Sequence, residues 1–77
     1  MWIQAGRHRL ISAHAARLDS IQLRPITHSD CFGLYLKGKE EQMVNLGDDL
    51  DKAEAVLAKV AAALAEGKGF LDLSGDL

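Results

Sequence analysis

The apolar residues between positions 50 and 64 recur at spacings of three and four, and this period restricts the fold more than any other feature of the sequence. It predicts an α-helix from about Asp49 to Glu66. One side of that helix carries an apolar stripe made of Leu50, Ala53, Leu57, Val60 and Leu64, widened by Val56 and Ala63.

Both ends of the predicted helix carry suitable residues. Asp48, Asp49 and Asp51 can accept hydrogen bonds from the free N–H groups of the first turn, and their charge complements the positive end of the helix dipole. Asp51 and Glu54 have the spacing of a capping box, with Asp in place of the usual Ser or Thr. Gly67 favours a helix stop, because glycine adopts the left-handed conformation without steric cost.

The opposite side of the helix is rich in alanine and poor in charge. It carries Ala55, Ala58, Ala62 and Ala65, where a surface helix normally presents more charged side chains. Alanine is the best helix former, so propensity alone can explain this composition. Small side chains also let a second helix or a partner chain approach closely, and the small size of the chain favours this second explanation.

Before position 48 the apolar residues alternate with a period of two. The runs 32–36 and 43–46 flank a polar turn around Gly38, which is typical of an antiparallel hairpin. Residues 20–26 predict a third strand that ends at Pro25, because proline donates no hydrogen bond to a ladder.

The first 20 residues fit two structures. Residues 2–12 can form a hairpin that turns at Gly6 and Arg7, whereas the alanine-rich segment from Ser12 to Leu23 also fits a helix. We favour strands joined by a turn.

The prediction is therefore an α+β fold, with an antiparallel β-meander of four to five strands packed by one C-terminal helix over residues 1–66. Residues 67–77 are expected to be a C-terminal tail, an edge strand or a docking segment.

The order of these elements resembles a loose class of small uncharacterised bacterial and phage proteins. The resemblance spans about Trp2 to Glu66 and is a pattern of hydrophobicity and turns. The residues that carry it are Leu10, Ile11, Leu18, Ile21, Phe32, Tyr35, Gly38, Val44, Leu46 and the segment from Asp48 to Leu64. It implies a β-meander capped by a C-terminal helix and implies no activity.

The chain is short for a self-sufficient fold. A chain of 77 residues is one domain, and such a domain buries only about 60% of its unfolded surface. Its one cysteine excludes an internal disulfide, and no Cys and His pair has zinc-finger spacing. We therefore expect burial to be completed by homo-oligomerisation. The interface candidates are Ala55, Ala58, Ala62, Phe70, Leu71 and Leu73.

The residues with reactive side chains do not form a recognisable site. Cys31 lies near His28 and Asp30 in the sequence, but catalytic partners usually come from distant segments. His8 and His14 are six positions apart, which matches neither a helix face nor a strand face. We expect no catalytic, metal-binding or cofactor-binding residue, and a protein that is not an enzyme. The expected function is that of a small interaction or assembly module that acts as a homo-oligomer.

The charge is unevenly distributed along the chain. Residues 1–29 contain four arginines against one aspartate, and residues 30–77 contain ten acidic and five basic residues. The alternative function is therefore nucleic-acid binding, with an aromatic ring of Trp2 or Tyr35 available for stacking on bases. Its candidate residues are Arg7, Arg9, Arg17 and Arg24.

The lone thiol and the lack of a signal peptide or an apolar run of membrane-spanning length favour the cytoplasm and no membrane contact.

Overall fold

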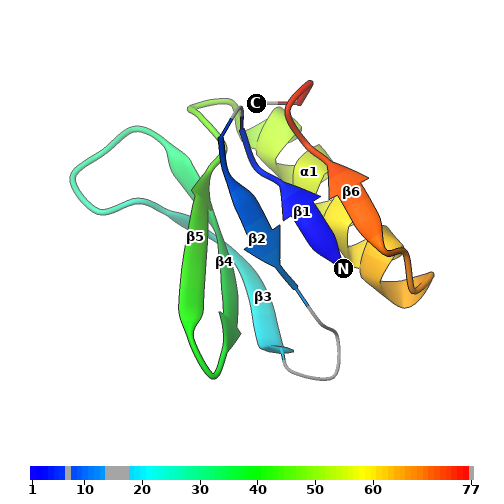
Figure 1. The fold of residues 1–77 in the computed structure, drawn as a ribbon. Coiled ribbons are helices and arrows are strands. Elements are labelled where there is room, and N and C mark those ends of the chain that lie inside the picture. Colours follow the sequence, from blue (N-terminus) through cyan, green and yellow to red (C-terminus); the bar gives the residue numbers. More distant parts are fainter. Residues whose placement is uncertain (7, 14–17, 77) are drawn as a thin grey trace.

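The computed structural model describes residues 1–6, 8–13 and 18–76 and shows an α+β fold (Figure 1). The described residues form six strands and one helix, where the sequence predicted four to five strands. In chain order they are β1 (Trp2–Gln4), β2 (Leu10–Ser12), β3 (Leu18–Pro25), β4 (Phe32–Gly38), β5 (Glu41–Asn45), α1 (Leu50–Ala65) and β6 (Phe70–Asp72). No helix among these residues is long and apolar enough to cross a membrane.

The strands form two sheets of three, not one meander. The first sheet, which we call the terminal sheet, has the order β2-β1-β6. Strand β1 pairs antiparallel with β2, so that Ile3 lies opposite Ile11, and parallel with β6, so that Ile3 also lies beside Leu71. Residues 70–72 are thus an edge strand.

The N-terminal hairpin is confirmed for the described residues, because β1 and β2 pair from position 2 to position 12. Gly6 has a φ of 139°, which is open to glycine alone at low cost. Arg7, the other expected turn residue, lies outside the described residues. The alternative helix from Ser12 is wrong where it can be followed, since Ser12 ends β2 and residues 18–25 form β3.

The second sheet, the meander sheet, has the predicted antiparallel order β3-β4-β5. In its register, Leu34 of the central strand lies between Leu23 and Val44. Pro25 is the last residue of the edge strand β3, as the missing N–H of proline requires. The β3-β4 and β4-β5 hairpins therefore agree with the alternation of apolar and polar residues in the sequence.

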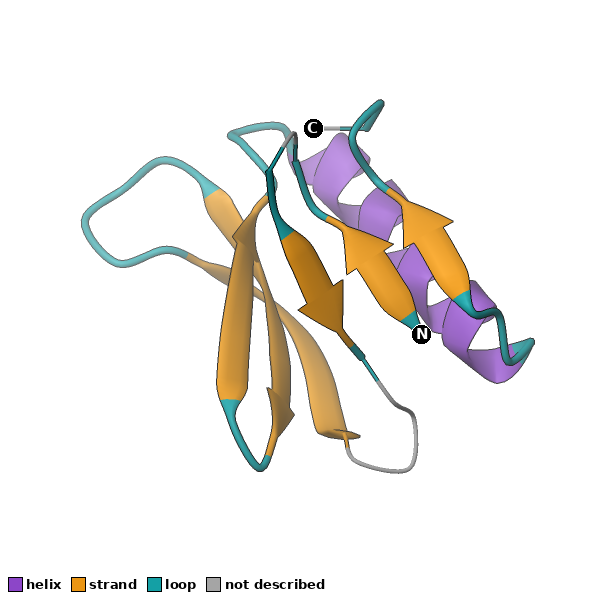
Figure 2. Cartoon of the chain, viewed as in Figure 1, coloured by secondary structure: helices purple, strands orange, loops and turns teal. Residues whose placement is uncertain are grey.

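One hydrophobic core joins the two sheets and the helix. Figure 2 shows the helix behind β1 and β6 and the meander sheet beside β2, and α1 also contacts β3 and β4 of the meander sheet. The buried residues come from all three layers. They are Ile3, Ile11, Ala13, Leu34, Leu36, Val44, Leu46, Ala53, Val56, Val60, Ala63, Leu71 and Leu73.

The buried side of α1 consists of the predicted residues Ala53, Val56, Val60 and Ala63, but its centre is shifted away from the leucines of the predicted stripe. Its centre is made of small residues, with Val60 fully buried, whereas Leu50 is 45% exposed. Leu57 and Leu64 are partly buried at the margin of the core. Small side chains at the centre let the helix axis approach the sheets closely, so the longer leucines cover the edges of the contact.

The N-cap of α1 lies two residues before the start of the predicted capping box. Oδ1 of Asp49 accepts hydrogen bonds from the N–H groups of Asp51 at 3.0 Å and Lys52 at 3.3 Å. Asp49 is therefore the N-cap, and the expected pairing of Asp51 with Glu54 is wrong.

The helix ends as predicted at glycine. Gly67 has a φ of 70°, its N–H donates to the C=O of Leu64 at 3.2 Å, and the N–H of Lys68 donates to the C=O of Ala63 at 3.1 Å. This pair of bonds is a Schellman motif, which turns the chain back toward β6.

Candidate functional site

The outer face of the terminal sheet carries exposed large apolar side chains. Successive residues of a strand point to opposite faces, so the burial of Ile3 and Leu71 in the core sends their neighbours outward. Trp2 is 53% exposed, Leu10 56% and Phe70 54%. We call this surface the Trp2 face, and it consists of Trp2, Gln4, Leu10, Ser12, Phe70 and Asp72.

The sheet register arranges the Trp2 face in two rows. In the first row, Trp2 on the central strand lies between Ser12 and Phe70. Adjacent strands are about 4.8 Å apart, so the two aromatic side chains are direct neighbours. In the second row, Gln4 lies between Leu10 and Asp72. The face therefore carries three large apolar side chains, two neutral polar side chains and one charged group at its β6 edge.

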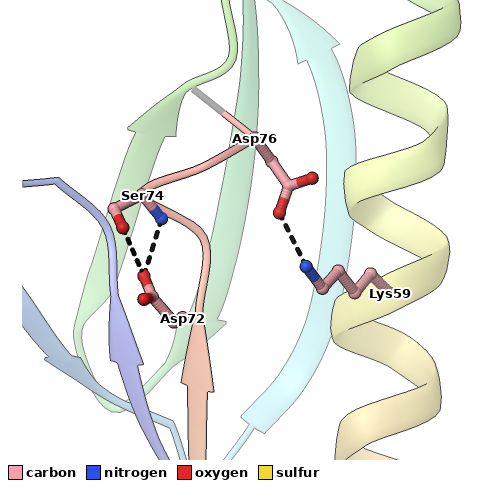
Figure 3. A network of polar contacts seen from close by, with 4 residues as sticks. All are labelled: Lys59, Asp72, Ser74 and Asp76. Carbon is pink, nitrogen blue, oxygen red and sulfur yellow. Dashed lines mark hydrogen bonds and ion pairs between the residues drawn. The ribbon is translucent and has the colours of Figure 1, made fainter.

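That charged group is fixed by the turn that follows β6. Oδ1 of Asp72 accepts hydrogen bonds from the hydroxyl of Ser74 at 2.6 Å and from its N–H at 2.8 Å (Figure 3). These two bonds, the hydroxyl one first, hold the pKa of Asp72 below its ordinary value of 3.8. An ion pair of 2.7 Å between Lys59 and Asp76 holds the same turn against α1. Asp72 is therefore an ionised carboxylate in a set orientation.

The outer face of the meander sheet is covered by its own side chains. A Cβ on Gly33 would contact Tyr35 at 2.9 Å, Ile26 at 3.1 Å and Met43 at 3.2 Å, so these three side chains close over the glycine. The guanidinium carbon of Arg24 lies 3.9 Å from the centre of the Tyr35 ring. Such a cation–π contact adds to the packing of the face.

The predicted interface residues separate into two groups. Phe70 is exposed on the Trp2 face, whereas Leu71 is 7% exposed and Leu73 is fully buried. These two leucines pack inside the chain, so they are not available to a partner. The alanines Ala55, Ala58 and Ala62 are exposed on α1, as expected.

Trp2 and Leu10 were absent from the predicted interface. The sequence did not show which residues share the face of Trp2. The alternation of residues 70–73 alone could have separated Phe70 from Leu71 and Leu73. The proximity of Trp2 to Phe70 depends on a parallel pairing that has no local signal.

The four arginines proposed for nucleic acid are not seen as one cluster. Arg7 and Arg17 lie outside the described residues, and Arg9 is exposed. Arg24 forms an ion pair of 3.2 Å with Glu41, and it lies over the ring of Tyr35. Tyr35 is therefore not open for stacking on a base from that side.

Cys31 closes the loop between β3 and β4. Its C=O accepts the N–H of Ile26 at 2.9 Å, and its own N–H donates to the hydroxyl of Ser29 at 3.1 Å. The thiol is half-buried, and His8 and His28 are exposed, whereas His14 lies outside the described residues. Within those residues, no group of three or more His, Cys, Asp and Glu side chains is placed to hold a metal ion.

Comparisons with protein-family models, with curated proteins and with solved structures found no match to the chain. The resemblance to small bacterial and phage proteins stays a prediction.

Proposed function

We propose that this protein is a small, non-enzymatic assembly module that associates with copies of itself through the Trp2 face. The observation that carries the proposal is the exposure of Trp2, Leu10 and Phe70 on one face of one sheet. Contiguous apolar patches that polar residues surround commonly mark interaction sites. The meander sheet, in contrast, covers its own outer face with Tyr35 and Met43.

The size of the patch sets the expected strength of association. About half of a large side chain amounts to about 100 Å², so Trp2, Leu10 and Phe70 present about 300 Å² together. With the polar residues of the face, each copy contributes about 500 Å², and the pair about 1,000 Å². Interfaces of this size are at the weak end, so we expect a dissociation constant between about 10 µM and about 1 mM.

Sedimentation equilibrium from about 5 µM to about 1 mM tests the proposal. We expect the average mass to rise with concentration, and Trp2→Glu to keep the chain monomeric because it buries an unpaired charge. Leu50→Glu is the matched control. Leu50 is 45% exposed, but it lies on the first turn of α1, away from the Trp2 face, so this variant should associate like the wild type. A wild-type chain that stays monomeric at every concentration contradicts the proposal.

Nucleic-acid binding is the alternative that we rank lower. Arg9 is exposed, which supports it. Asp72 sits on the same face as Trp2, however, and repels a phosphate backbone near the ring. A labelled oligonucleotide at low salt tests this alternative, because electrostatic binding weakens steeply as salt is added.

For either function we propose a reducing compartment such as the cytoplasm, since the lone cysteine has no partner for an internal disulfide.

A further inference from the structure

We draw no further inference here: the strongest candidate, the exposed Trp2 face of the terminal sheet with the carboxylate of Asp72 at its β6 edge, belongs to the site already described, and nothing in the structure shows what covers it.

Discussion

Replacement of Gly33 by alanine tests how the meander sheet covers its own outer face. Gly33 is in the central strand β4 and is buried, and an added Cβ would lie 2.9 Å from Cε2 of Tyr35. Ile26 at 3.1 Å and Met43 at 3.2 Å close the other sides. The Tyr35 ring cannot move away without cost, because the guanidinium of Arg24 lies 3.9 Å from its centre.

Two opposing effects determine the magnitude. An extra methyl group in a packed site costs about 1–3 kcal/mol in the free energy of unfolding. Alanine in place of glycine in a strand returns about 0.5–1 kcal/mol, because the unfolded chain loses less entropy on folding. We therefore expect Gly33→Ala to destabilise the fold by about 1–2 kcal/mol. For a domain of this size, that lowers the melting temperature by about 5–15 °C.

Urea denaturation followed by circular dichroism measures this change, with Gly69→Ala as the matched control. A Cβ at Gly69 would have nothing within 4 Å, so this variant should be as stable as the wild type or slightly more stable. If Gly33→Ala unfolds at the same urea concentration as the wild type with an unchanged slope, Tyr35, Ile26 and Met43 do not pack over Gly33 as described.

The remaining predictions concern local hydrogen bonds and the core. Asp49→Ala removes the N-cap of α1 and should cost about 1 kcal/mol in urea denaturation, whereas Asp48→Ala should not, because the cap bonds belong to Asp49. Leu34→Ala opens a cavity at a fully buried position and should cost about 2–5 kcal/mol by the same measurement. Ser74→Ala should raise the pKa of Asp72 toward 3.8 in an NMR titration, since both the hydroxyl and the ordering of the turn keep it low. Because the pKa of Asp72 is lower in the folded chain, the ionised carboxylate stabilises the fold above pH 3.8. This stabilisation is lost as the pH falls through the pKa of Asp72 in the folded chain, so Ser74→Ala should make stability less sensitive to acid.

The helix was predictable because its signals are local. The stop at Gly67 and the acidic start near Asp49 lie within one turn of the residues that they serve, so the predicted span of 49–66 encloses α1. The face that α1 buries was less predictable. Leu50 belongs to the sequence stripe but is 45% exposed, because the position of the sheets, and not the hydrophobicity of the residue, decides which side of the helix is covered.

The terminal sheet was the least predictable part. Its strands have three residues each, which is too short for alternation to be recognised reliably. Its parallel pair joins Trp2 to Phe70, far apart in the sequence. No turn residue specifies such a pairing, because the two strands lie at opposite ends of the chain. The Trp2 face could therefore not be found before the register of the sheet was known.

The two sheets together explain why we propose a partner for one surface of this chain. Each sheet has three strands and turns one face to the common core, so each leaves a second face. On the meander sheet, strands of five to eight residues carry Tyr35 and Met43 over Gly33, with Arg24 above the ring. On the terminal sheet, the strands have three residues each and carry fewer side chains that could cover the outer face. Trp2 and Phe70 remain about half exposed there. Under the proposed function, the surface of a partner covers this face. A second copy is the partner that we propose, because a two-fold contact covers the same exposed apolar side chains on both chains at once.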